Sequence, residues 1–266
     1  MMQSVTNRQG KALSVRVEGP QDAAVIIFSN SLGTDKSMWD TQAEYLKDHY
    51  RVVRYDTRGH GQSEVMGDST LANLGEDVID IMDALHIPQA HFCGISMGGI
   101  TALWLGIYAA DRFKTITVAN SAAKIGQMQA WLTRAEQVEQ HGLADLVETT
   151  HSRWFSNDFD YQHSALAQQT IQSLATTPAK GYANACGVLA YADVRAELEQ
   201  LALPCLLICG SKDPVTTLED GEFIRARAQN AETASIAASH LSNIEAAAEF
   251  NQVLLKFIER NESPSV

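Results

Sequence analysis

The fold is decided by the stretch Ala90-His91-Phe92-Cys93-Gly94-Ile95-Ser96-Met97-Gly98-Gly99, which places Gly-x-Ser-x-Gly between a short apolar run and an amphipathic helix. Glycines on both sides of Ser96 let a strand and the following helix pack closely, so that the serine hydroxyl stays exposed on a sharp turn. The N-terminus of that helix favours negative charge developing nearby. Ser96 is therefore the candidate nucleophile.

The motif by itself is weak evidence, because Gly-x-Ser-x-Gly arises by chance in roughly one chain in ten of this length. Its flanks strengthen it: Ile100, Leu103 and Ile107 recur at helical spacing after the motif, and a strand-like run precedes it. For this stretch alone, a glycine-rich turn with a bystander serine remains the alternative.

Composition limits the class of protein. The 266 residues, 45% hydrophobic and 20% charged, suit one large α/β domain with or without an insertion. A net charge of −12 argues against a broad basic surface for nucleic acid or anionic membrane. No signal-peptide core and no membrane-length apolar run is visible. We therefore expect a cytoplasmic protein without nucleic-acid or membrane partners, whose oligomeric state the sequence leaves open.

The cysteines agree with this expectation. The four cysteines, Cys93, Cys186, Cys205 and Cys209, form no Cys-x-x-Cys pair. Cys93 and Cys209 lie inside apolar, strand-like runs. We interpret them as buried free thiols, which are typical of a reducing compartment.

Strand-like and helix-like segments alternate along most of the chain. Alternation over 13–18 predicts an antiparallel edge strand, and the apolar run 23–28 predicts a strand buried on both faces. Further strands are predicted at 50–55, in a run that ends at 91–93, and at 113–119, 204–210 and 232–236. Helices are predicted at 38–46, 71–85, after Ser96, at 218–227 and at 244–260. This alternation predicts a mostly parallel sheet with helices on both faces.

Between residues 124 and 190 the alternation gives way to helical stretches rich in Gln, Ala and aromatic residues. An insertion between strands of such a sheet would lie over their carboxyl ends as a cap. We therefore expect a core domain of residues 1–123 and 191–266 and a helical cap domain of residues 124–190.

A serine nucleophile needs a base to accept its proton and an acid to orient that base. In this topology the chain order is serine, acid, histidine. Asp213 follows the first strand after the insertion, and of the 8 histidines only His240 comes later. Alone, Asp213 would be a turn former and His240 a solvated loop residue. Together with Ser96 they satisfy one ordering rule, which predicts a triad.

The oxyanion hole should consist of backbone N–H groups, which need no reorganisation during the reaction. Met97, directly after the nucleophile, supplies one donor. Leu32, in the loop after the 23–28 strand, is the candidate for the other, with a plain turn residue as the alternative. His60 ends another glycine-rich loop, and its place before Ser96 in the chain predicts a supporting role rather than that of the base.

The strand, motif and helix, with the order Ser96, Asp213, His240, resemble the α/β-hydrolase fold over nearly the whole chain. That resemblance implies a mostly parallel eight-stranded sheet with a helical cap. Three stretches are similar to 3-oxoadipate enol-lactonases: 29–34 (SNSLGT), 54–61 (RYDTRGHG) and 93–99 (CGISMGG). The first has Asn30-Ser31 where a His-Gly pair is common elsewhere in the superfamily, and this departure itself resembles the lactonases.

The resemblance implies hydrolysis of 3-oxoadipate enol-lactone to 3-oxoadipate, in the β-ketoadipate pathway of aromatic compound degradation, through an acyl-enzyme and without a metal or organic cofactor. This small-molecule substrate is an anion, so an acidic enzyme needs a local cation for it. Arg134 and Arg153 are the candidates, with Trp131 and Trp154 as apolar walls, and solvated helix arginines are the alternative.

Fold does not determine substrate. A general carboxylesterase, a carbon–carbon bond hydrolase and a haloperoxidase-like enzyme therefore remain alternatives on the same scaffold. A non-catalytic receptor that binds a small molecule under the cap is an alternative of another class, against which the complete triad argues.

Overall fold

Eight strands form one sheet, in the order β1-β2-β4-β3-β5-β6-β7-β8, in the computed structural model, which describes residues 1–262. The pairs β1–β2 and β2–β4 are antiparallel and the other neighbours are parallel. The strands are β1 (Met2–Thr6), β2 (Ala12–Glu18), β3 (Val25–Ser29), β4 (Arg51–Tyr55), β5 (Ala90–Ile95), β6 (Phe113–Ala119), β7 (Cys205–Gly210) and β8 (Ala231–Ile236). The prediction of a mostly parallel eight-stranded sheet is confirmed.

One prediction is wrong at the antiparallel end of the sheet. Residues 13–18 are expected to form an edge strand, but β2 lies between β4 and β1, and β1 is the edge. In β1 only Val5 is buried, so its sequence carries little of the hydrophobic pattern that predicts a strand. Backbone pairing with β2 defines β1 instead.

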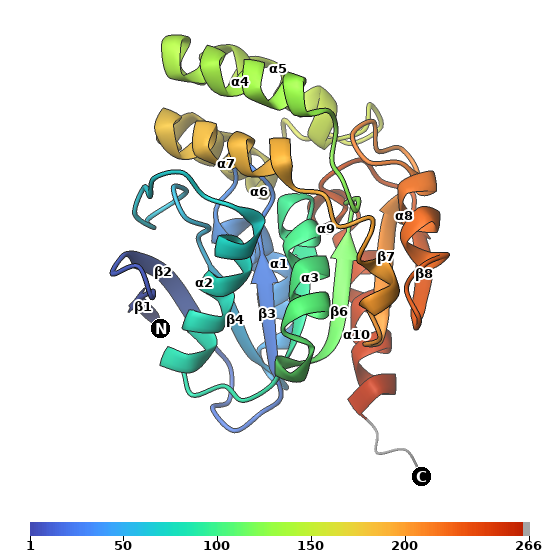
Figure 1. Ribbon diagram of the computed structural model, residues 1–266. Helices are drawn as coiled ribbons and strands as arrows, with labels where there is room; N and C mark the ends of the chain where they lie inside the picture. Colours follow the sequence, from blue (N-terminus) through green and yellow to red (C-terminus); the bar gives the residue numbers. More distant parts are fainter. Residues whose placement is uncertain (263–266) are drawn as a thin grey trace.

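Helices cover both faces of the sheet (Figure 1). Helices α2 (Leu71–Ala84) and α3 (Met97–Tyr108) lie on one face, and α1 (Asp40–Leu46) and α10 (Ala247–Glu262) lie on the other. The remaining core helices are η1 (Lys36–Trp39), η2 (Ala110–Arg112), η3 (Leu198–Gln200), α8 (Leu218–Arg225) and α9 (Ser242–Glu245). Because helices cover both faces, β3, β5 and β7 bury every residue, which explains their continuous apolar sequences.

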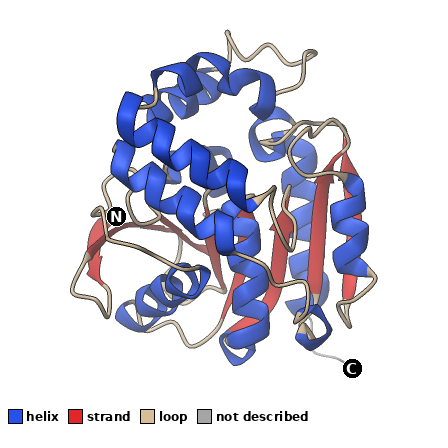
Figure 2. Ribbon diagram, turned by 45° about the horizontal axis from the view of Figure 1, so that its top comes forward, coloured by secondary structure: helices blue, strands red, loops and turns tan. Residues whose placement is uncertain are grey.

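Four further helices separate β6 from β7, and we call them the cap helices. They are α4 (Met128–His141), α5 (Ala144–Trp154), α6 (Ala165–Thr176) and α7 (Ala179–Tyr191). They lie beyond the carboxyl ends of the parallel strands, and Figure 2 brings this end of the molecule forward. Helix α7 buries eight residues but α4 buries only Val138, so α7 forms the inner layer of the cap and α4 the outer.

The four cysteines are free and buried, as predicted. Burial raises the pKa of the Cys186 and Cys205 thiols to about 12 and that of Cys209 to about 11. These thiols therefore act as small apolar core residues. Within residues 1–262, no helix combines the length and the apolar character needed to cross a membrane.

His91 connects three elements at the end of the sheet away from the cap. Its Nδ1 lies 2.8 Å from the Thr115 hydroxyl of β6, and its Nε2 lies 3.2 Å from the Glu262 carboxylate at the end of α10. Burial lowers the pKa of His91, although the charge of Glu262 opposes this shift. The unfolded chain therefore binds a proton at this position at a higher pH than the folded protein does.

This pKa difference predicts a loss of stability in mild acid. Below the ordinary histidine pKa of about 6.5 the unfolded state binds more protons, so the free energy of unfolding falls as the pH falls, by at most about 1.4 kcal/mol per pH unit for this group. Urea unfolding of the wild type and His91→Gln at about pH 7.5 and pH 5.5 tests it. The wild type should lose more stability than the variant. Equal losses would contradict a lowered pKa of His91 in the folded protein.

Candidate active site

Ser96 lies on a sharp turn between β5 and α3, with φ 57° and ψ −114°. This backbone conformation is strained for a residue with a side chain. A Cβ on Gly94 would lie 1.9 Å from the carbonyl oxygen of Gly98, and one on Gly98 would lie 2.3 Å from that of Ser29. The Ser96 N–H donates to the Ala119 carbonyl over 2.9 Å. Both glycines of the motif are therefore required by close backbone packing.

His240 and Asp213 meet at the carboxyl ends of β8 and β7. His240 Nδ1 lies 2.8 Å from Asp213 Oδ2, and the two side chains are only 4% and 0% exposed. Burial alone would raise the pKa of Asp213, but His240 and hydrogen bonds from Asn120 and the Val215 N–H lower it overall. Because a carboxylate can only accept, His240 Nδ1 carries a proton and Nε2 is left to act as an acceptor.

Asn120, directly after β6, holds this pair in place. Its Nδ2 donates to Asp213 Oδ2 and to the Ser239 carbonyl, each over 3.0 Å, and its Oδ1 accepts from the Ser242 hydroxyl. Its φ of 41° also lies in the left-handed region. Sequence reasoning missed this role, although a polar residue directly after a buried strand was the available indication.

The two N–H groups predicted for the oxyanion hole, those of Leu32 and Met97, differ from their neighbours in hydrogen bonding. In the described part of the chain neither donates to a protein acceptor, whereas the amides that follow them, of Gly33 and Gly98, both do. Leu32 also lines the same cavity as Ser96. Within residues 1–262, these two backbone donors are therefore free to bind an oxygen atom of a ligand.

A cavity of about 200 Å³ lies between the strand ends and the cap helices. Ser96, His240 and Leu32 line it from the core. From the cap it is lined by all four predicted substrate-binding residues: Trp131, Arg134, Arg153 and Trp154. Asp213 lies behind His240 and, like Met97, does not line the cavity. The structure therefore brings seven of the nine predicted site residues around one space, and Asp213 contacts it through His240.

The cap side of the cavity is cationic. The Arg134 guanidinium lies over the Trp131 ring, 4.9 Å from its centroid. Burial lowers the pKa of Arg153, and the charge of Arg134 lowers it further. Within residues 1–262, neither arginine forms an ion pair with a carboxylate. Two guanidinium groups that share a cavity without a counter-ion favour an anionic ligand.

Tyr182 of α7 also lines the cavity, and sequence reasoning missed it. Burial raises the pKa of its phenol to about 12, so the hydroxyl is neutral at physiological pH. An aromatic residue at helical spacing in the cap looks like a core residue, and only the packing of α7 shows that it faces the cavity. Among the described residues, no three His, Cys, Asp or Glu side chains are grouped so as to hold a metal ion.

The His240 loop is tied directly to the end of α5. The Leu241 N–H donates to the Trp154 carbonyl over 3.0 Å. Glu245 accepts from the N–H groups of Ser156 and Ser239, each over 3.0 Å. These bonds keep the cap wall next to His240.

A family model described as alpha/beta hydrolase fold matches residues 24–247. The chain therefore belongs to the α/β-hydrolase family.

Within this family the chain is similar to 3-oxoadipate enol-lactonases. It is 62% identical to 3-oxoadipate enol-lactonase 1 of Acinetobacter baylyi over 255 residues, 96% of each chain. It is 44% identical to 3-oxoadipate enol-lactonase 2 of the same organism over 253 residues, 95% of each chain. The crystal structure of the enol-lactonase from Burkholderia xenovorans matches with a TM-score of 0.93 and 36% identity, covering 97% of this chain and 100% of that one. The resemblance expected from the sequence is confirmed.

Proposed function

We propose that the protein hydrolyses 3-oxoadipate enol-lactone to 3-oxoadipate through an acyl-enzyme on Ser96. One observation supports this above all: the cavity that holds Ser96 and His240 also holds two arginines, Arg134 and Arg153, that have no carboxylate partner within residues 1–262. An anionic ester fits this cavity, because Ser96 and His240 can act on its carbonyl and the arginines can bind its negative charge. The relative that is 62% identical is named a 3-oxoadipate enol-lactonase.

In the first half of the reaction, Ser96 Oγ attacks the lactone carbonyl while His240 Nε2 accepts its proton. Asp213 keeps the other imidazole nitrogen protonated and stabilises the imidazolium. The N–H groups of Leu32 and Met97 donate to the oxyanion that forms. The hydrogen bond between Asp213 and His240 and the unpaired N–H groups of Leu32 and Met97 support these roles.

Collapse of the tetrahedral intermediate breaks the ring C–O bond and expels an enolate. The His240 imidazolium gives its proton to the enolate, which becomes a ketone, and His240 is neutral again. An enolate demands less acid catalysis from His240 than an amine would. Water that loses a proton to His240 then attacks the acyl carbonyl and releases Ser96.

We further assign the free carboxylate of the substrate to Arg134 and Arg153, and the walls beside its ring to Trp131 and Trp154. Residues 124–190 act as the cap domain over a core of residues 1–123 and 191–266. A cytoplasmic location is supported by the four free, buried thiols.

Turnover of three substrates by the purified protein tests the assignment: the enol-lactone, a p-nitrophenyl ester and a ring-cleavage diketone. We expect kcat/KM for the lactone to exceed the other two values by about 10²-fold or more, because the aryl ester lacks the carboxylate and the diketone lacks the ester carbonyl that Ser96 attacks. Faster turnover of the aryl ester would indicate a carboxylesterase, and faster turnover of the diketone a carbon–carbon bond hydrolase. Ligand binding without fluorophosphonate labelling of Ser96 would indicate a receptor.

Arg134→Ala separates substrate binding from chemistry. We expect it to raise KM for the lactone by about 10-fold or more, because a charge-assisted hydrogen bond to the carboxylate is lost. KM for the neutral p-nitrophenyl ester should change by less than about twofold. Arg195→Ala is the matched control, because Arg195 is an exposed arginine paired with Asp193 outside the cavity. Equal effects of Arg134→Ala on both substrates would remove Arg134 from carboxylate binding.

A further inference from the structure

His60 is a fully buried side chain that takes no part in the reaction as described, yet it bonds to the loop that carries Leu32. Its relative exposure is 0%. The Gly33 N–H donates to His60 Nε2 over 3.0 Å, and His60 Nδ1 lies 3.1 Å from the Arg58 carbonyl oxygen. The residue after the candidate oxyanion donor is thus held by an imidazole from another loop.

These two partners determine the protonation of the ring. A carbonyl oxygen can only accept, so His60 Nδ1 carries the proton, and an amide N–H can only donate, so Nε2 is unprotonated. Burial lowers the pKa of His60, although the Arg58 carbonyl and the charges of Asp56 and Asp35 oppose this shift. The ring is therefore the neutral Nδ1–H tautomer.

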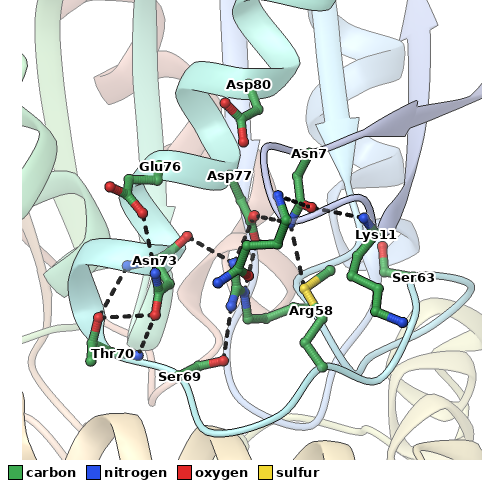
Figure 3. Close-up of polar contacts among 12 residues, drawn as sticks. Asn7, Lys11, Arg58, Ser63, Ser69, Thr70, Asn73, Glu76, Asp77 and Asp80 are labelled. Carbon is green, nitrogen blue, oxygen red and sulfur yellow. Dashed lines mark hydrogen bonds and ion pairs between the residues drawn. The ribbon is translucent and has the colours of Figure 1, made fainter.

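Arg58 anchors the His60 loop to α2 (Figure 3). Its Nε and one terminal nitrogen lie 2.7 and 2.8 Å from the two oxygens of Asp77. It also donates to the Ser69 hydroxyl over 2.9 Å and to the Asn73 carbonyl over 3.2 Å. Asn7 donates to Asp77 as well, over 2.7 Å. The Arg58 side chain therefore fixes to α2 the loop whose carbonyl orients His60.

Cap helices α6 and α7 pack against the Gly33 loop, and α7 also packs against the loop that carries Gly59 and His60. Gly33 has φ 80°, and a Cβ there would lie 2.6 Å from the Leu174 side chain of α6 and 3.1 Å from the Tyr182 ring of α7. A Cβ on Gly181 of α7 would lie 2.1 Å from the Gly59 carbonyl oxygen. The loop at Gly33 therefore packs against the cap on one side and bonds to the His60 imidazole on the other.

We propose that His60 is a positioning residue for the oxyanion hole: by accepting the Gly33 N–H, it keeps the peptide units of the loop turned so that the Leu32 N–H stays unpaired beside Ser96. The inference rests on the proposed Ser96 mechanism. Oxyanion donors act on charge that develops in the transition state, so loss of the His60 acceptor lowers kcat and leaves KM nearly unchanged.

The variants His60→Leu and His60→Gln test this role with p-nitrophenyl acetate. That neutral ester needs Ser96 and the oxyanion hole but neither arginine, so the test holds even if the lactone assignment fails. Leucine removes the acceptor for Gly33, whereas the glutamine side-chain oxygen can restore it. We expect His60→Leu to lower kcat by about 100-fold with KM within about threefold, and His60→Gln to keep kcat within about tenfold of the wild type.

His91→Leu is the matched control, because it removes another buried, hydrogen-bonded histidine that does not line the cavity. Its kcat should equal that of the wild type. The affinity for a boronic acid that forms a tetrahedral adduct with Ser96 should fall in His60→Leu by the same factor as kcat/KM. Wild-type kcat in His60→Leu, or an equal loss in His60→Gln, would overturn the proposal.

A measurement on the wild type keeps the proposal testable if His60→Leu does not fold. In protein labelled with ¹⁵N-histidine, the His60 resonances should show a protonated Nδ1 and an unprotonated Nε2 from about pH 8 to pH 6. A protonated Nε2 at neutral pH would show that the ring does not accept from Gly33, and would overturn the proposal.

Discussion

Replacing Ser96 by alanine is expected to lower kcat for the enol-lactone by about 10⁴- to 10⁶-fold, because the variant lacks the hydroxyl that forms the acyl-enzyme. The cavity, the two arginines and the oxyanion donors stay in place, so substrate binding should change little. Alanine inherits the φ of 57° at this position, and the turn is held by backbone bonds, so the fold should be retained. Steady-state kinetics and circular dichroism measure the two effects.

Fluorophosphonate labelling makes the Ser96 test specific. The wild type should gain the mass of one covalent adduct and Ser96→Ala none. Ser152→Ala is the matched control, because Ser152 is an exposed serine of α5 whose hydroxyl donates to the Thr149 carbonyl. Its activity and labelling should equal those of the wild type. Activity of Ser96→Ala within about tenfold of the wild type would exclude Ser96 as the nucleophile.

Asp213→Asn is expected to lower kcat by about 10⁴-fold by changing the tautomer of His240. If the new amide nitrogen replaces Oδ2, it faces His240 Nδ1 and also the donor groups of Asn120 and Thr216. His240 must then accept at Nδ1 and carry its proton on Nε2, where it can no longer take the proton of Ser96.

The opposite orientation of the new amide is also unfavourable, because it leaves buried donors without acceptors. Its nitrogen would then face the N–H groups of Val215 and Thr216, which now donate to Asp213 Oδ1. Buried donors without acceptors cost about 1–3 kcal/mol each, so stability should fall instead. Kinetics together with urea unfolding distinguish the two cases. Asp193→Asn, an aspartate outside the site, is the control. A loss of kcat below about tenfold with unchanged stability would exclude the orienting role of Asp213.

The parallel part of the sheet could be predicted from sequence because its physical cause is local. Strands such as β3 and β7 are buried on both faces and are therefore continuously apolar. Helix α2 begins where Thr70 caps it, and its apolar stripe repeats at helical spacing. The edge strand β1 could not be predicted, because pairing with β2 rather than burial makes it a strand.

The candidate site likewise contains residues that the sequence predicted and residues that only the structure revealed. The motif and the chain order select Ser96, Asp213 and His240, and the structure places all three at the carboxyl ends of β5, β7 and β8. Their catalytic roles stay predictions. Asn120 and Tyr182 escaped notice because their roles depend on partners far away in sequence: Asn120 bonds to Asp213, 93 residues later.

By itself, the sequence determined the α/β class, the strained serine turn, the residue types of the triad and the family resemblance, since these depend on the periodicity, spacing and chemistry of neighbouring residues. Only the tertiary structure decided which cap side chains face the cavity, that Arg134 and Arg153 lack a carboxylate partner there, and that His60 bonds to Gly33 across 27 residues. The physical reason is that these contacts arise from packing between separate elements. No local pattern encodes which atoms such packing brings within hydrogen-bond distance.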